Sequence, residues 1–249
     1  MKIYGLIGQT LRHSFSKRYF EQKFEQLGRF DCQYELFELP VIESLPDFIG
    51  AHPDLQGFNV TIPYKQSILP YLDDLEGEAQ HIGAVNTVRI FRSEGQVHAI
   101  GYNTDAEGFR ASLASKRLPT RALVLGTGGA AAAIAQVLRQ WQVAFRMVSR
   151  TAGNGNLTYS ELTPALIQQY PLIINCTPVG TQSDEKPALP YEAISEHHFL
   201  YDLVYNPEKT AFLKEGEKRH AHIQNGLQML HLQAEAAWKI WQSNQRECL

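Results

Sequence analysis

The chain has few cysteines, and they are arranged for neither a disulfide framework nor a zinc cluster. Cys32, Cys176 and Cys248 are odd in number and far apart, and no two of them have CxxC spacing. Because structural disulfides belong to oxidising compartments, this usage predicts a cytoplasmic protein. The nine histidines form no HExxH pattern, so we expect no metal site.

Long apolar runs and an excess of positive charge are also missing. Nowhere do eighteen apolar residues follow one another, and the opening MKIYGLIGQT lacks the features of a signal peptide. The net charge is −3, without the basic excess of a nucleic-acid surface. The sequence therefore predicts neither a membrane nor a nucleic-acid partner. Its 249 residues, 44% hydrophobic and 20% charged, are typical of one large or two medium globular domains.

The most informative stretch is RALVLGTGGAAAAIAQVL at 121–138, a predicted strand, glycine turn and helix. Gly126, Gly128 and Ala131 fit the dinucleotide pattern GxGxxG/A, in which the glycines allow a sharp turn and close approach to a pyrophosphate. The helix amino terminus would bind the anion, with Gly129 and Ala130 beside it. A glycine-rich turn without a ligand is the alternative.

The end of the next strand indicates which dinucleotide is bound. An NAD site usually has a carboxylate there, which bonds the ribose 2′-hydroxyl, whereas an NADP site has an arginine near the 2′-phosphate. This chain has Ser149, Arg150 and Thr151, and no carboxylate before Glu161. The sequence therefore favours NADP, although Arg150 could also be a solvated surface charge.

The order of predicted elements indicates α/β architecture throughout. After Pro119, strands alternate with helices as in a doubly wound domain, and their predicted ranges are 122–125, 145–149, 172–176 and 199–204. Loops at strand carboxyl ends, where such sheets bind ligands, carry Thr177 and Tyr205. Before Pro119 we expect strands at 2–7, 34–39 and 55–65, a hairpin of 84–91 and 97–102, and helices at 16–27, 45–50 and 106–116. An amphipathic helix is predicted at 227–241.

Several polar residues of the first half are candidates with structural alternatives. Ser14 and Ser16 precede or open a helix and could be N-caps. Thr61 and Lys65 lie near the end of a strand broken by Pro63, and could be an ordinary polar face followed by a surface lysine. Asp105 could be the N-cap of the helix that follows it.

Taken together, the spaced motifs give a more specific indication. The chain resembles shikimate dehydrogenases along almost its whole length. The matching patterns are HSxS at 13–16, NVTxPxK at 59–65, GAxNT at 83–87, NTD at 103–105, YDxVYNPxxTxFL at 201–213 and GLxMLxxQAxxA at 226–237.

The resemblance implies an enzyme that reduces 3-dehydroshikimate to shikimate with NADPH. It implies an N-terminal α/β substrate domain, residues 1–105 completed by the returning helix at 227–249, and an NADP-binding Rossmann domain, residues 106–226. The implied catalytic residues are Lys65 and Asp105. The implied substrate contacts are Ser14, Ser16, Thr61, Asn86, Thr104, Tyr205 and Gln233. The implied cofactor contacts are Gly126, Gly128, Gly129, Ala130, Ser149, Arg150, Thr151, Thr177, Gly226 and Met229. We expect a monomer or homodimer.

Some positions depart from the family pattern. Lys17 stands where proline is expected after HSxS, Ser149 replaces an asparagine, and Asn154 replaces a second basic residue near the 2′-phosphate. The lost charge predicts a weaker preference for NADP. The alternatives are an NAD-dependent relative that also accepts quinate, a non-catalytic dinucleotide-binding regulator, and a folate-linked dehydrogenase of similar architecture.

Overall fold

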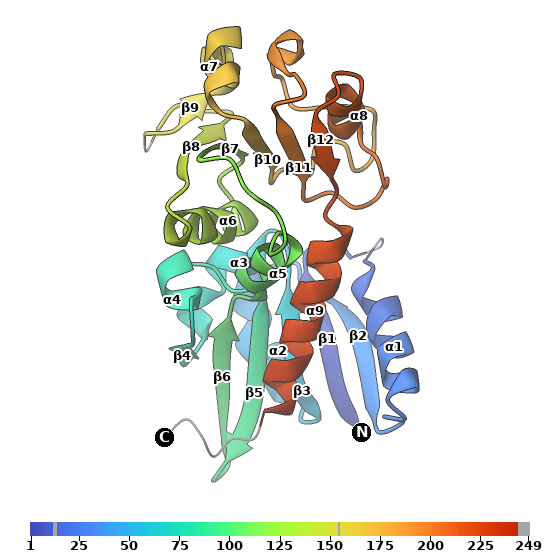
Figure 1. Cartoon of the computed structure of the whole chain (residues 1–249). Coiled ribbons are helices and arrows are strands. Elements are labelled where there is room, and N and C mark those ends of the chain that lie inside the picture. Colours follow the sequence, from blue (N-terminus) through green and yellow to red (C-terminus); the bar gives the residue numbers. More distant parts are fainter. Residues whose placement is uncertain (12–13, 154, 244–249) are drawn as a thin grey trace. The chain divides into compact units, whose positions relative to one another are not determined.

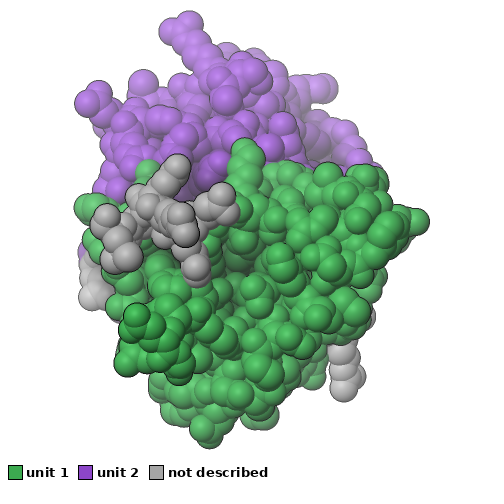
Figure 2. All heavy atoms as spheres, turned by 90° about the horizontal axis from the view of Figure 1, so that it is seen from below, with its two compact units in different colours: residues 1–104, 234–249 green, residues 105–233 purple. Residues whose placement is uncertain are grey.

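The computed structural model describes residues 1–11, 14–153 and 155–243. The chain divides into two compact units, coloured separately in Figure 2. Unit 1 comprises Met1–Thr104 and Ala234–Leu249, and unit 2 comprises Asp105–Gln233. The last helix, α9 (Leu227–Gln242), therefore contributes residues to both units.

Unit 1 is built on a mixed sheet of six strands in the order β2-β1-β3-β5-β6-β4. β1 runs parallel to β2 and β3, whereas β5 and β6 form an antiparallel hairpin that pairs with β3. The hairpin turns at Glu94 and Gly95, both with positive φ, as a two-residue connection requires. The strands are β1 (Lys2–Gly8), β2 (Cys32–Glu38), β3 (Leu55–Val60), β4 (Asp74–Leu75), β5 (Thr87–Ser93) and β6 (Gln96–Tyr102).

Helices cover both faces of this sheet (Figure 1). Because side chains alternate along a strand, Ile7 of β1 joins one core cluster and Tyr4 joins the other. The Tyr4 cluster contains Trp241 of α9, whose indole N–H donates to the Val88 carbonyl at 3.0 Å. A side chain at Gly57 would overlap the Trp241 ring, so glycine is required there. The helices that begin in unit 1 are α1 (Ser16–Gln26), α2 (Leu45–Ala51), α3 (Tyr64–Ser67), α4 (Ala79–Ile82) and α5 (Thr104–Ser112).

Unit 2 contains an all-parallel sheet in the order β12-β11-β10-β7-β8-β9. By position along the chain this order is 6-5-4-1-2-3, that of the classical dinucleotide-binding fold. The strands are β7 (Arg121–Leu125), β8 (Ala144–Ser149), β9 (Leu157–Thr158), β10 (Leu172–Asn175), β11 (Phe199–Asp202) and β12 (His222–Gln224). The helices are α6 (Gly129–Gln140), α7 (Pro164–Gln169) and α8 (Ala211–Glu217).

The predicted fold class is confirmed: two α/β units, one with a doubly wound parallel sheet, and a last helix that packs in the first unit. One local prediction was wrong, one structural alternative does not hold, and three short strands were missed. The strand expected over 55–65 ends at Val60, and Lys65 lies on α3. Asp105 is not an N-cap but lies in the first turn of α5. The short strands β4, β9 and β12 were not predicted, since two or three residues show no periodicity.

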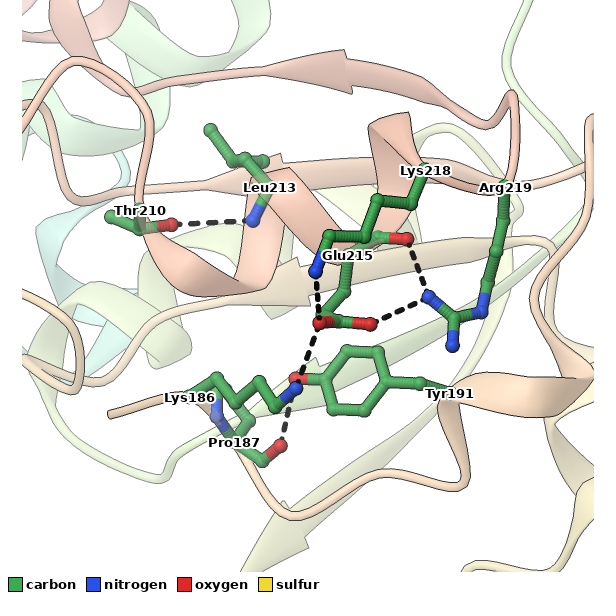
Figure 3. Close-up of polar contacts among 8 residues, drawn as sticks. All are labelled: Lys186, Pro187, Tyr191, Thr210, Leu213, Glu215, Lys218 and Arg219. Carbon is green, nitrogen blue, oxygen red and sulfur yellow. Dashed lines mark hydrogen bonds and ion pairs between the residues drawn. The ribbon is translucent and has the colours of Figure 1, made fainter. Parts of the chain in front are cut away.

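An ion-pair cluster fixes the long loop after β10 to α8 (Figure 3). The Glu215 carboxylate lies 3.0 Å from Lys186 Nζ and 3.1 Å from Lys218 Nζ, and it also accepts from Arg219. Lys186 lies 4.7 Å above the centre of the Tyr191 ring. The cluster therefore joins the loop that leaves the carboxyl end of β10 to α8. Among the described residues, no helix is long and apolar enough to cross a membrane.

We expect Glu215→Gln to destabilise the protein at neutral pH more than at acid pH. Hydrogen bonds from Lys186, and then from Lys218, lower the pKa of Glu215 to about 2. A depressed pKa means that the charged group stabilises the fold above its unfolded pKa, and that this contribution is lost as the pH falls toward 2. After allowance for solvent screening, the expected loss is about 1 kcal/mol.

Urea unfolding of wild type and variant between pH 7 and pH 3 measures this effect. Glu217→Gln, which removes a more exposed partner of Lys209 from the same helix, is the matched control and should change stability less. A Glu215→Gln effect that is the same at every pH would contradict the assignment.

Candidate active site

The candidate substrate residues of unit 1 gather at one edge of its sheet. β1 and β3 are parallel, so their carboxyl ends lie together. Thr87, which opens β5, pairs with both Asn59 of β3 and Tyr102 of β6. The segments that leave this edge carry Ser14, Ser16, Thr61, Lys65, Asn86 and Thr104.

Asn86 and Thr104 form a buried pair that is joined by hydrogen bonds in both directions. The Asn86 Nδ2 group donates to Thr104 Oγ1 at 3.0 Å, and the Thr104 backbone N–H donates to Asn86 Oδ1 at 2.7 Å. Both side chains are almost completely buried, with 3% and 1% of their surfaces exposed. The pair fixes the point at which α5 begins, and hence the place of Asp105 one residue later.

Asn59 and Tyr34 extend the hydrogen bonds of this pair. The Tyr34 hydroxyl donates to Asn59 Oδ1 at 2.9 Å, and Asn59 Nδ2 donates to the Asn86 carbonyl at 3.2 Å. Burial raises the pKa of Tyr34, and a hydrogen bond with Ser16 opposes that rise, so Ser16 lies against Tyr34. Tyr34 was not predicted as a site residue, because in its strand pattern it looks the same as an aromatic residue of the core.

Lys65 is held by its backbone beside Asn86. Its carbonyl accepts the Val85 N–H at 2.7 Å, and its side chain is half-buried. Thr61 lies against β1, where its N–H donates to the Ile7 carbonyl at 2.9 Å. A Cβ at Gly8 would be 2.6 Å from Thr61 Cγ2, so glycine is needed at the end of β1.

The serines at the start of α1 differ in their roles. Ser14 Oγ accepts the Ser16 N–H at 3.2 Å, so its hydroxyl satisfies a donor of the helix terminus, although Ser14 is not the N-cap that the structural alternative expected. Ser16 is the first helical residue, and the N-cap position belongs to Phe15, whose side chain has no oxygen with which to cap the helix. His13 of the HSxS pattern lies outside the described residues.

Asp105 lies in unit 2, close to the carboxyl end of β10. It is buried, with 6% of its surface exposed. Burial raises the pKa of the Cys176 thiol, and the charges of Asp202 and Asp105 raise it further, so the Asp105 carboxylate acts on the residue that follows β10. Gly108, one turn further along α5, packs against Gln233 of α9, since a Cβ there would be 2.9 Å from Gln233 Cβ.

The glycine turn of unit 2 has the geometry that a dinucleotide needs. Gly126 has a φ of +111°, and a Cβ placed on it would lie 3.2 Å from Thr177 Cγ2. Both residues follow the carboxyl ends of the paired strands β7 and β10. Gly128 precedes α6 in extended backbone, and no described atom lies within 4 Å of a Cβ placed there. The amino terminus of α6 therefore has open space and available N–H groups, and Gly129 and Ala130 form its first turn.

Gly226 and Met229 lie at the start of α9. A Cβ at Gly226 would overlap the Leu203 carbonyl, so only glycine fits where the chain passes the end of β11. Its N–H donates to the Val204 carbonyl at 3.2 Å, next to the half-buried Tyr205. Met229 is buried, with 6% of its surface exposed. Glycine is therefore required at 226 by the backbone of Leu203, as it is at 126 by positive φ and by Thr177.

The corner after β8 carries the positive charge expected beside a 2′-phosphate. Ser149 Oγ donates to the Thr151 carbonyl and shapes the turn, and Arg150 is exposed. The Arg146 guanidinium lies 3.5 Å from the Gly155 carbonyl. Asn154 lies outside the described residues. Among the described residues, no three His, Cys, Asp or Glu side chains are grouped so that they could hold a metal ion.

The comparisons with known proteins point to one family. A family model, the shikimate dehydrogenase substrate binding domain, matches residues 6–88. Shikimate dehydrogenase (NADP(+)) of Methanococcus maripaludis is 34% identical over 96% of this chain and 91% of its own length. The structure of Thermus thermophilus shikimate 5-dehydrogenase with NADP(H) and shikimate has a TM-score of 0.83 at 33% identity, covering 97% of this chain and 94% of that one. The Listeria monocytogenes enzyme with shikimate and NAD has a TM-score of 0.81 at 26% identity, covering 97% and 91%. The chain belongs to the shikimate dehydrogenase family.

Proposed function

We propose that this protein catalyses the reversible, NADPH-dependent reduction of 3-dehydroshikimate to shikimate. The observation that carries the proposal is the buried Asn86–Thr104 pair at the edge of the unit 1 sheet, followed directly by Asp105. It holds an amide and a hydroxyl in fixed positions at this edge of the sheet, and the next residue in the chain is a buried carboxylate. Family membership identifies the ligand class as a hydroxylated ring acid.

The types of the substrate residues suit that ring. Each hydroxyl that the site buries without a partner would cost about 1–3 kcal/mol, so several neutral hydrogen-bonding groups are needed. We assign this task to the hydroxyls and amides named above, with Tyr205 near the carboxylate. The full set is Ser14, Ser16, Thr61, Asn86, Thr104, Gln233 and Tyr205.

Lys65 and Asp105 provide the acid chemistry in this proposal. The dinucleotide supplies the hydride. As the carbonyl is reduced, negative charge develops on its oxygen, which needs a donor and then a proton. A lysine ammonium carries protons that it can donate, and a carboxylate stabilises this charged form. Lys65 therefore acts as a charged donor that polarises the carbonyl and delivers the proton, and Asp105 orients it.

The preference for NADP is also part of the proposal. Ser149, Arg150 and Thr151 form the turn after β8, where Arg150 offers an exposed guanidinium to a 2′-phosphate. The Methanococcus relative is named for NADP(+), whereas the Listeria structure contains NAD, so the family uses both dinucleotides. The cytoplasmic location and the oligomeric state stay predictions.

We expect Lys65→Met to abolish the chemical step while the fold is kept. The variant nearly keeps the length of the side chain but can neither donate the proton during reduction nor accept it during oxidation, so kcat for shikimate oxidation should fall about 1000-fold, or about 4 kcal/mol in the barrier. KM should change less than about threefold, because several other groups bind the ring.

Steady-state absorbance of the reduced nicotinamide measures both constants. Lys239→Met, at an exposed lysine of α9, is the control and should keep the wild-type rate. An unchanged kcat in Lys65→Met would refute the role of Lys65.

We expect Arg150→Ala to change the choice of dinucleotide. Loss of a charge-assisted contact worth about 1.5–3 kcal/mol should lower kcat/KM for NADP⁺ about 10- to 100-fold and leave kcat/KM for NAD⁺ within about twofold. Initial rates with the two cofactors at saturating shikimate give the ratio, and rates with quinate test the alternative substrate.

The matched control is Arg146→Ala. That arginine lies on β8, the strand that leads to Arg150, but its guanidinium faces the Gly155 carbonyl. The control should alter neither constant by more than about threefold. An equal loss with both dinucleotides in Arg150→Ala would show that Arg150 does not recognise the 2′-phosphate.

A further inference from the structure

A chain of buried hydrogen bonds runs beneath the glycine turn of unit 2, from Thr177 through Asn175 to Asp202. Thr177 Oγ1 donates to Asn175 Oδ1 at 2.6 Å, and Asn175 Nδ2 donates to Asp202 Oδ1 at 2.9 Å. The second carboxylate oxygen accepts from Thr210 Oγ1 at 2.6 Å. Asn175 and Asp202 are fully buried at the ends of neighbouring strands, β10 and β11.

The carboxylate at one end and the backbone N–H of Thr177 at the other fix the direction of every bond in this chain. An ionised carboxylate only accepts hydrogen bonds, so the amide group of Asn175, and not its oxygen, must face Asp202. Asn175 Oδ1 therefore faces Thr177, where it accepts both the backbone N–H at 3.1 Å and the hydroxyl. The single proton of the Thr177 hydroxyl is thus donated to the interior of the protein. Its oxygen accepts the Val179 N–H at a long 3.4 Å and has a second lone pair for a ligand.

Thr177 lies where a ligand of this fold is held. It follows β10, and its Cγ2 lies 3.2 Å from the Cβ position of Gly126, so it stands at the point where the strand order reverses. The preceding residue, Cys176, is influenced by the charge of Asp105. Thr177 is therefore near the carboxylate to which we assign a part in the reaction.

We propose that Asp202 and Asn175 are positioning residues that hold the Thr177 hydroxyl as a hydrogen-bond acceptor for a donor on the nicotinamide half of the dinucleotide. The donors available there are a ribose hydroxyl and the carboxamide N–H. A phosphate oxygen, which only accepts, would meet a lone pair and be repelled. This inference rests on the proposed function, because it assumes that unit 2 binds a nicotinamide dinucleotide.

A purely structural role explains Asp202 less well. Thr210 caps α8, where its Oγ1 accepts the Leu213 N–H at 3.3 Å (Figure 3). An asparagine at 202 could also hold the Thr210 side chain, and it would do so without a buried charge. Burial raises the pKa of Asp202 to about 6, so the charge is kept against a desolvation penalty. A carboxylate accepts from the Asn175 amide, the Val204 N–H and the Thr210 hydroxyl at the same time, whereas an amide would have to turn its N–H groups toward Thr210.

A double-mutant cycle on the full-length protein tests the link. Asp202→Asn keeps the shape but removes the charge that strengthens the bond from the Asn175 amide, so the Thr177 hydroxyl is held less firmly as an acceptor. Thr177→Val removes the hydroxyl. We expect each single change to weaken NADP⁺ binding about 5- to 10-fold by calorimetry, and the double change to weaken it by no more than about twofold beyond Thr177→Val. Binding of 2′,5′-ADP, which lacks the nicotinamide half, should change less than about twofold in all three.

Tyr201→Phe is the matched control. Tyr201 precedes Asp202 on β11, is fully buried, and its hydroxyl lies 2.9 Å from Ser112 Oγ, outside the chain of bonds that leads to Thr177. Its NADP⁺ affinity should stay within about twofold of wild type. If Asp202→Asn does not fold, Asn175→Ser takes its place in the same cycle.

Additive losses in the cycle, no loss in Asp202→Asn, or an equal loss of 2′,5′-ADP affinity would each overturn the proposal. A wild-type protein that binds NADP⁺ but does not oxidise shikimate would instead refute the proposed function and leave the result of the cycle intact.

Discussion

The hydrogen bonds between Asn86 and Thr104 are the constraint on which the rest of the site depends. They join the start of β5 to the start of α5, and they do so with almost no access to water. An unpaired amide in such surroundings would be costly, so the two residues hold each other in one arrangement. Since α5 begins at Thr104, the position of Asp105 follows from the same bonds.

Unit 2 depends in a similar way on close approach of backbone. Its parallel register brings the ends of β7, β10 and β11 to one edge. At this edge a side chain on Gly226 would overlap neighbouring backbone, and a side chain on Gly126 would strain a backbone with positive φ. The buried Asp202 and Asn175 connect two of those strands. These contacts hold the backbone in place at the edge where the dinucleotide is expected. The ion pairs of Glu215 hold the adjoining loop on α8.

Much of this could be predicted from the sequence, and what could not has a physical reason. The strand, glycine turn and helix at 121–138 are local, so periodicity and glycine spacing predict them. The candidate residues came from the resemblance to a family. The bonds from Tyr34 to Asn59 and from Asn175 to Asp202 were not predictable, because they depend on which strands become neighbours and in which register. The end of β3 at Val60 was missed for the same reason, since pairing with β5 decides it.

The central claim is that a hydroxylated ring acid binds against the Asn86–Thr104 pair and is oxidised there. The most direct test is the kcat/KM for shikimate, with NADP⁺ as acceptor, of the wild type and of Thr104→Val. The account predicts saturable formation of reduced nicotinamide by the wild type, and a loss of about 10- to 100-fold in the variant with little change in the affinity for NADP⁺. An inactive wild type, or a Thr104→Val variant that turns over shikimate at the wild-type rate, would contradict it.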